Sequence, residues 1–360
     1  MKNEILIWGA GAIGGVLGAY WARAGQSVTM VDIVADHVTA CRSAGLKIEG
    51  PVEEFTQVVE AVLPEDLTGT YSCVVLAVKA QATEAAIASI LPHLREDGFI
   101  LSAQNGLNEK VIAGLAGAHR TMGAFVNYGA DWIEPGRILF GNRGAVVVGE
   151  TDNVIRERTQ RMHKLLRIFE PDAVLTDDIW GYLWSKMGYG AMLFATALTS
   201  DSMTANFADL DRGPALTGLA REVMRTAVAE GVNPRPFNGF EPKAFMPDAA
   251  DASALKSLAA LAEFNAQTAK THSGIYRDLA VRKRKTEADQ QLGIIVDIAA
   301  DHGIEEELRT LRCFHYVAHT TAKRGTLIFQ PCISQVERLD AQAQEEMRWF
   351  EQIFRRDGQF

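Results

Sequence analysis

Residues Glu4-Ile5-Leu6-Ile7-Trp8-Gly9-Ala10-Gly11-Ala12-Ile13-Gly14 decide the fold of this chain. An apolar strand leads into a Gly-X-Gly-X-X-Gly motif, a helix of small residues follows, and a second strand over residues 27–32 ends at Asp32. A bare glycine motif would be weak support, but this order of strand, turn, helix and acid-terminated strand is typical of a Rossmann βαβ unit. We therefore expect an α/β fold that begins with a dinucleotide site.

Each residue type in the motif has an expected role. Gly9 permits the tight turn after the strand, Gly11 lets the backbone approach a pyrophosphate, and Gly14 lets the helix pack closely on the sheet. At the start of the helix, the N–H groups around Ala12 and Ile13 would bind the phosphates. The alternative is a glycine-rich turn without a ligand.

Asp32 bears on the choice of cofactor. Its carboxylate would accept hydrogen bonds from the adenosine ribose hydroxyls, and its charge would repel a 2′-phosphate. The sequence therefore favours NAD(H) over NADP(H), unless Asp32 is an ordinary surface acid.

The composition excludes several classes of protein. At 360 residues, with 48% hydrophobic and 22% charged residues, we expect a globular chain of two domains. The net charge of −9 without a basic arm argues against nucleic acid or an anionic membrane as a partner. The four cysteines lack metal-ligand spacing, and no apolar run is long enough to span a membrane. We expect a cytoplasmic protein with reduced thiols, no metal site and no signal peptide.

The pattern along the chain changes near residue 177. Before it, strands alternate with helices, which predicts a doubly wound, mainly parallel sheet; after it, helical periodicity dominates. The predicted domains are a Rossmann domain over residues 1–177 and an all-α substrate-binding and dimerisation domain over residues 178–360. Further strands are expected over residues 73–79, 99–102, 125–130, 145–149 and 174–175, with a hairpin region over 45–57. Helices are expected over residues 35–44, 82–94, 153–169, 180–198, 204–231, 254–271, 276–303 and 306–323, and an amphipathic helix over 345–360.

Two polar residues follow buried strands. Lys79 and Asn105 stand where strands end, and ligands of such sheets bind at the carboxyl ends of strands. An ordinary strand-end lysine and an Asn-Gly turn are the alternatives, because Asn-Gly is a common turn pair.

Several segments together resemble one family. They are Gly9–Gly15, Leu76-Ala-Val-Lys79-Ala-Gln81, Ser102-Ala-Gln-Asn105-Gly106-Leu107, Pro135-Gly136-Arg137, Trp184-Ser-Lys186 and Thr286-Glu287-Ala-Asp289. In this order they resemble the ketopantoate reductases, also called 2-dehydropantoate 2-reductases, over most of the chain. The resemblance implies reduction of a 2-oxo acid to a 2-hydroxy acid by a nicotinamide hydride, in a cleft between a Rossmann domain and a helical domain.

The resemblance also implies roles for individual residues. Hydride addition builds negative charge on the carbonyl oxygen, so a positioned acid must deliver a proton, and Lys186 matches the family's acid. Partial desolvation would lower the pKa of Lys186 toward neutrality; the alternative is an exposed helix lysine. Glu287 matches a glutamate that binds a substrate hydroxyl, Asn105 would bind the nicotinamide or the substrate, and Lys79 would lie over the cofactor. The matching segments also make Gln81 a cofactor-binding candidate.

The cations that precede Glu287 admit two interpretations. Arg277, Arg282, Lys283, Arg284 and Lys285 could form a solvated face of one helix and make i,i+4 pairs with Glu287. Alternatively, one or two of them could turn inward to hold a substrate carboxylate.

Departures from the family pattern affect the substrate and the cofactor. Gly190 stands where the family usually has asparagine, and a serine pair is reduced to Ser273-Gly274, so that Ser273 alone is a substrate-binding candidate. Near Ile33, NADP-dependent members carry a basic residue; NADP(H) stays possible by the resemblance, although Asp32 favours NAD(H). The substrate is therefore expected to be a 2-oxo acid or a similar branched carbonyl compound, because loss of polar contacts relaxes discrimination.

Other functions remain open at this point. An opine-type dehydrogenase that reduces an imine would share this layout, but it usually relies on a histidine-centred site, which the sequence does not place. The chain could also be a catalytically silent NAD-binding regulator. His315 and His319 have the i,i+4 spacing of a metal pair but lack a third ligand in sequence. The expected assembly is a homodimer.

Overall fold

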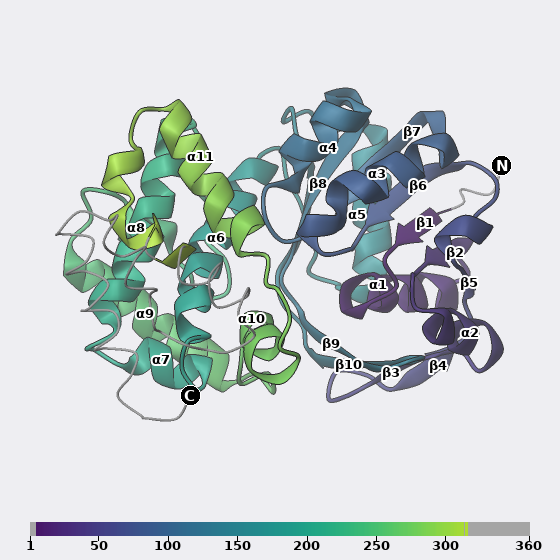
Figure 1. The fold of residues 1–360 in the computed structure, drawn as a ribbon, viewed down its shortest axis with the longest axis horizontal. Coiled ribbons are helices and arrows are strands. Elements are labelled where there is room, and N and C mark those ends of the chain that lie inside the picture. The colour runs from purple at the N-terminus through teal and green to yellow at the C-terminus, as the bar shows by residue number, and fades with distance from the viewer. Residues whose placement is uncertain (1–4, 313, 316–360) are drawn as a thin grey trace, which may run out of the picture. The chain divides into compact units, whose positions relative to one another are not determined.

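The computed structural model describes residues 5–312, 314 and 315 of the chain (Figure 1). The chain divides into two compact units, Met1–Trp180 and Gly181–Phe360. The first combines strands with helices, and the described part of the second is built from helices, which confirms the predicted fold class. Among the described residues, no helix has both the length and the hydropathy that crossing a membrane requires.

The first unit contains an eight-stranded sheet in the order β12-β11-β8-β7-β6-β1-β2-β5. Neighbouring strands are parallel except β11 and β8, which are antiparallel. The strands of this sheet are β1 (Ile5–Trp8), β2 (Val28–Val31), β5 (Glu60–Val62), β6 (Tyr71–Leu76), β7 (Leu94–Ser102), β8 (Thr121–Val126), β11 (Val146–Glu150) and β12 (Val174–Leu175). The α-helices of the unit are α1 (Ala12–Arg23), α2 (Ala35–Ser43), α3 (Thr83–Ile90), α4 (Asn108–Ala116) and α5 (Glu157–Phe169). Its short 3₁₀ helices are η1 (Pro64–Asp66), η2 (Ala80–Ala82), η3 (Leu91–His93) and η4 (Ala118–Arg120).

Both faces of the central strands are buried, and β1, β2, β6 and β7 each contribute to two cores. Ile5 and Ile7 of β1 pack in one cluster with residues of α1, α2 and α5, whereas Leu6 and Trp8 pack in the other with residues of α3 and α4. Successive side chains of a strand point to opposite faces, so a strand covered on both sides must be apolar throughout. This is why continuous apolar runs predicted the central strands.

The ends of four neighbouring strands lie in register. Trp8 is level with Val31 of β2 and with Leu76 of β6, and Leu76 is level with Ser102 of β7. The loops that follow these strands therefore leave the sheet at one edge. The chain builds outward from β1 through β2 and β5 and then returns to β6 on the other side of β1, which makes this edge the place where such sheets bind ligands.

A second sheet in the first unit was not predicted. It has four strands in the order β4-β3-β10-β9, formed by β3 (Leu46–Glu49), β4 (Phe55–Gln57), β9 (Gly129–Glu134) and β10 (Arg137–Asn142). The hairpin expected over residues 45–57 is confirmed as the antiparallel pair β3 and β4. The single strand expected over residues 125–130 is wrong, because β8 ends at Val126 and β9 begins at Gly129 in the other sheet. Val126, Tyr128 and Ala130 all pack in one core, so hydrophobicity does not change where the chain changes sheets.

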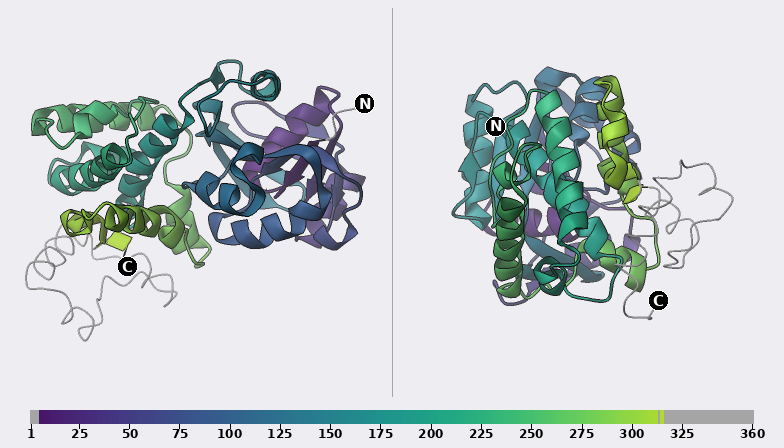
Figure 2. Two further views of the ribbon diagram at one scale, coloured as in Figure 1. Left: turned by 90° about the horizontal axis from the view of Figure 1, so that it is seen from above. Right: turned by 90° about the vertical axis from the view of Figure 1, so that its left-hand side faces the viewer.

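Helices of the second unit lie side by side (Figure 2). They are α6 (Ile179–Thr196), α7 (Met203–Ala208), α8 (Gly213–Ala229), η5 (Pro242–Phe245), α9 (Asp251–Ala266), α10 (Gly274–Tyr276), the π-helices η6 (Arg277–Val281) and η7 (Asp289–Gly293), α11 (Ile294–Asp301) and η8 (Glu305–Glu307). The helix predicted over 306–323 runs past the described residues, and the one over 345–360 lies outside them.

Two long helices predicted here are interrupted. The prediction over residues 204–231 is wrong, because α7 ends at Ala208 and α8 begins at Gly213, with Pro214 in its first turn. Proline lacks an N–H and clashes with the preceding turn, so a helix can begin with it but cannot continue through it. The prediction over residues 276–303 is also wrong, since the chain leaves the helix between η6 and η7, where Lys283 has a φ of 48°.

Candidate active site

The glycine turn between β1 and α1 is tightly packed at two of its glycines. A Cβ atom on Gly9, whose φ is +103°, would lie 2.9 Å from the backbone carbon of Ala77. A Cβ atom on Gly14 would lie 2.0 Å from the carbonyl oxygen of Gly9 and 3.0 Å from the Cβ of Ala77. Both positions therefore exclude a side chain because the turn is packed against itself and against the loop after β6.

Gly11 is different, because a Cβ atom there would meet no heavy atom within 4 Å. Gly11 is the N-cap of α1, with an ordinary extended backbone (φ −69°) and no side-chain cap on the helix. Packing of the protein therefore does not explain a glycine here, whereas close approach of a ligand to the backbone does. The open space and the uncapped helix N-terminus fit a dinucleotide pyrophosphate.

Asp32 lies directly after β2 and is fixed by the backbone. Its Oδ2 accepts a hydrogen bond from the N–H of Ala10 at 3.0 Å, and its Oδ1 accepts one from the N–H of Val34 at 3.0 Å. A carboxylate has about four acceptor positions, so each oxygen can also accept a ribose hydroxyl. Ile33, the next residue, is 83% exposed.

Lys79, Gln81 and Asn105 follow β6 and β7, and their side chains are exposed. The loops that carry them are joined by Gln104, whose amide donates to the carbonyl of Val78 at 3.0 Å and to the hydroxyl of Thr83 at 2.9 Å. Gln104 was not among the predicted site residues, although it belongs to one of the segments that carry the resemblance. The Asn-Gly turn also exists, since Gly106 has a φ of +102°.

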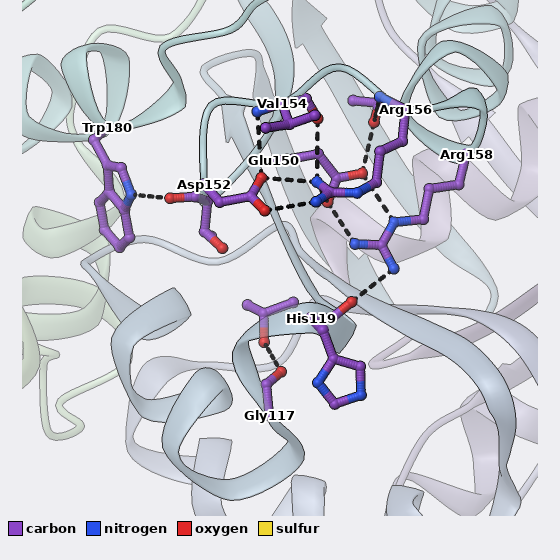
Figure 3. A network of polar contacts seen from close by, with 11 residues as sticks. Gly117, His119, Glu150, Asp152, Val154, Arg156, Arg158 and Trp180 are labelled. Carbon is purple, nitrogen blue, oxygen red and sulfur yellow. Dashed lines mark hydrogen bonds and ion pairs between the residues drawn. The ribbon is translucent and has the colours of Figure 1, made fainter.

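A charged network in the same unit contains none of the predicted site residues (Figure 3). The buried carboxylate of Glu150, at the end of β11, accepts hydrogen bonds from Arg158 at 2.6 and 2.9 Å and from the hydroxyl of Thr159 at 2.6 Å. Arg158 also donates to the carbonyl of His119, which precedes β8. The network therefore fastens α5 to the sheet.

Lys186 and Glu287 belong to the second unit. Lys186 is half-buried on α6, and Glu287 is 5% exposed just before η7. Gly190 is four residues after Lys186, and Gln291 is four residues after Glu287. A Cβ atom on Gly190 would be 3.5 Å from the Oε1 of Gln291. Residues four apart share a helix face, so α6 and the segment that carries Glu287 approach each other at this point. The amide of Gln291 lies where a side chain at position 190 would extend.

Ser273 is buried and acts as an N-cap, because its hydroxyl accepts a hydrogen bond from the N–H of Tyr276 at 3.2 Å. Among the cations that follow, Arg284 pairs with the buried Asp278 at 2.8 Å, and Lys285 pairs with Asp289 at 3.2 Å. The expectation that these cations share one continuous helix is wrong, as the interruption shows.

Arg277 lies in the π-helix η6 and is half-buried. Burial lowers the pKa of its guanidinium, and the positive charge of Arg282 lowers it further. Both effects destabilise the cation.

The described residues hold no cluster of three or more His, Cys, Asp and Glu side chains with the geometry of a metal site. His315 lies 3.0 Å from the carboxylate of Asp289, and His319 lies outside the described residues. Cys41 and Cys73 are free and buried.

Comparison with known proteins covers both units. A family model described as ketopantoate reductase PanE/ApbA matches residues 5–153, and its C-terminal counterpart matches residues 178–320. A 2-dehydropantoate 2-reductase of Archaeoglobus fulgidus is 27% identical over 304 residues, which are 84% of this chain and 93% of that protein.

Two solved structures share the fold. A 2-dehydropantoate 2-reductase from Geobacter metallireducens superposes with a TM-score of 0.74 at 24% identity, over 90% of this chain and 100% of that one. A D-mandelate dehydrogenase, in a ternary structure with NADH and anilino(oxo)acetate, superposes with a TM-score of 0.75 at 18% identity, over 89% and 99%. These matches confirm the resemblance found in the sequence: this chain belongs to the ketopantoate reductase family.

Proposed function

We propose that this protein is a nicotinamide-dependent reductase that converts a 2-oxo acid to a 2-hydroxy acid. The observation that carries this proposal is the match of both halves of the chain to the ketopantoate reductase models. The open space at Gly11, above an uncapped helix N-terminus, supports a bound dinucleotide.

NAD(H) is the proposed cofactor, and when bound it would supply the hydride. The N–H groups of Gly11, Ala12 and Ile13 would bind its pyrophosphate, and the two oxygens of Asp32 would accept the ribose hydroxyls. Exposed apolar Ile33 offers no positive charge to a 2′-phosphate. On the neighbouring loops, Lys79, Gln81 and Asn105 would contact the cofactor.

Lys186 is the proposed general acid. Its ammonium would donate a proton to the carbonyl oxygen of the substrate while negative charge develops there, which is the step that a ketone reduction requires of the protein. The hydride forms the new C–H bond at the carbonyl carbon, and an N–H bond of Lys186 breaks as its proton forms the O–H bond, so the ketone becomes an uncharged hydroxyl group beside the carboxylate.

Asn105, Glu287 and Ser273 are the residues that we propose orient the substrate. Buried Glu287 would accept a hydrogen bond from a substrate hydroxyl, and Ser273 would supply a hydroxyl. Of the cations that precede Glu287, half-buried Arg277 is the one that we propose binds the carboxylate of the 2-oxo acid, because a guanidinium can donate two parallel hydrogen bonds to a carboxylate. The amide of Gln291 near Gly190 would replace the polar group that asparagine supplies elsewhere in the family.

A panel of 2-oxo acids, incubated with NADH and separately with NADPH, tests the reaction by nicotinamide absorbance. We expect turnover of at least one 2-oxo acid, and faster turnover with NADH. Faster turnover with NADPH would contradict the cofactor assignment, and inactivity toward every 2-oxo acid would favour a non-catalytic NAD-binding regulator.

Lys186→Ala tests the general acid. Loss of a positioned acid lowers the rate by about 10²–10⁴-fold, whereas NADH affinity should not change. Lys256→Ala, at an exposed lysine of α9, is the matched control and should keep full activity. Turnover by Lys186→Ala at the wild-type rate would eliminate this role.

The proposed homodimer is tested separately by light scattering.

A further inference from the structure

A buried histidine contacts the glycine turn from outside the motif. His37, on α2, has no exposed surface, and its Nε2 lies 2.9 Å from the carbonyl oxygen of Ala10. Ala10 stands between the first two glycines of the motif. Ala10 also donates its backbone N–H to the carboxylate of Asp32. Both polar groups of Ala10 are therefore held by residues that follow β2.

The other ring nitrogen of His37 identifies its tautomer. The backbone N–H of Gly136 donates to Nδ1 at 2.9 Å, and the indole N–H of Trp132 approaches the same atom at 3.4 Å. Since Nδ1 accepts these hydrogen bonds, it carries no proton, and in the neutral ring the proton lies on Nε2. Nε2 is then the donor to the Ala10 carbonyl.

This contact controls the direction of an amide in the cofactor turn. In a planar trans peptide the C=O and the following N–H point in opposite directions. By holding the carbonyl of Ala10, His37 turns the N–H of Gly11 away from itself. Ala10 is 1% exposed, so water could not easily replace the lost donor.

The partner of His37 belongs to the second sheet. Gly136, with a φ of +75°, lies in the turn between β9 and β10, and its carbonyl accepts a hydrogen bond from the N–H of Lys47. It is also part of the Pro135-Gly136-Arg137 segment of the family resemblance. One chain of hydrogen bonds thus runs from the four-stranded sheet through the imidazole to the glycine turn.

We propose that His37 is a positioning residue for the dinucleotide: its neutral Nε2–H tautomer, fixed by Gly136, sets the conformation in which the glycine turn binds NAD(H). This inference rests on the proposed cofactor and adds a residue outside the glycine motif to its binding. It assigns to the four-stranded sheet the function of supporting the cofactor turn.

Two substitutions test the two ring nitrogens of His37 one at a time. The side-chain amide of glutamine reaches the position of Nε2, so His37→Gln keeps a donor for Ala10. Asparagine is one carbon shorter, so its amide reaches only the position of Nδ1, and His37→Asn keeps an acceptor for Gly136 while the Ala10 carbonyl loses its donor. His119→Asn, at an exposed histidine in the same unit, is the control for the chemical change.

The Kd of NADH is measured for each variant by fluorescence resonance energy transfer from tryptophan to the nicotinamide. Thermal unfolding of each variant is measured in parallel. Loss of one hydrogen bond to a buried carbonyl predicts about five- to tenfold weaker NADH binding for His37→Asn. His37→Gln should stay within about twofold of wild type, by the same reasoning. At saturating NADH the turnover number of His37→Asn should equal that of wild type.

Equal NADH affinity of His37→Asn and wild type would overturn the proposal. Equal weakening of both variants, in step with a lower unfolding temperature, would also overturn it, since that pattern belongs to a residue that only stabilises the fold. Failure of wild type itself to bind NADH would instead contradict the proposed function.

Discussion

Alanine substitutions at Gly11 and Gly14 should separate ligand binding from folding. Both residues belong to one motif, and both substitutions add a single methyl group. At Gly14 the added Cβ would lie 2.0 Å from the Gly9 carbonyl oxygen, whereas at Gly11 it would meet nothing within 4 Å. The same chemical change should therefore damage stability at one position and cofactor binding at the other.

The magnitudes follow from the packing. Overpacking costs about 1–3 kcal/mol, and backbone contact at Gly14 places the cost near the upper end, so Gly14→Ala should lower Tm by about 6–12 °C in a unit of this size. Gly11→Ala introduces no clash and should change stability by less than about 1 kcal/mol. Its methyl would displace the pyrophosphate from the turn, and loss of one or two charge-assisted hydrogen bonds weakens NADH binding by about 10–100-fold.

Thermal unfolding and NADH titration of the purified variants measure the two effects. Gly114→Ala is the matched control, because Gly114 is inside α4 and its Cβ would also meet nothing within 4 Å. It should gain up to about 1 kcal/mol of stability from helix propensity and keep its NADH affinity. Unchanged NADH binding by Gly11→Ala would refute the assignment of the open space to the pyrophosphate.

Three further predictions concern other parts of the first unit. Arg158→Ala should destabilise the protein by about 2–3 kcal/mol, because the buried carboxylate of Glu150 loses its bidentate partner; urea unfolding checks this, and a change below about 0.5 kcal/mol would contradict it. Burial raises the pKa of both Cys41 and Cys73 to about 12, so at pH 8 neither thiol should react with iodoacetamide until the protein unfolds, as peptide mass spectrometry can establish. Ile33→Arg should tighten NADPH binding without changing Tm, because Ile33 is 83% exposed; equal NADPH affinity before and after the substitution would argue against a 2′-phosphate position beside it.

The sequence predicted the parts of the fold that depend on local patterns. The first βαβ unit follows from residue types at fixed spacing, and the central strands follow from apolar runs that two cores require. The second sheet could not be predicted in this way, because the chain passes from β8 to β9 through residues that pack in the same core, so the hydrophobic pattern has no break there.

Buried polar residues were also missed, for a different reason. His37 and Gln104 bond to backbone groups such as the carbonyls of Ala10 and Val78. Any residue except proline offers the same backbone donor and acceptor, so the partners leave no pattern in the sequence. Lys283 similarly gave no sign of its positive φ, since lysine fits a helical pattern well.

The level ends of β1, β2, β6 and β7 limit how this protein could diverge. Each residue of a strand advances the chain by about 3.3 Å, so deleting one would draw the following loop back by that distance and turn every later side chain to the opposite face. Replacing residues in the loops has neither effect. Relatives with new substrates should therefore differ in loop sequence while the lengths of these strands stay constant.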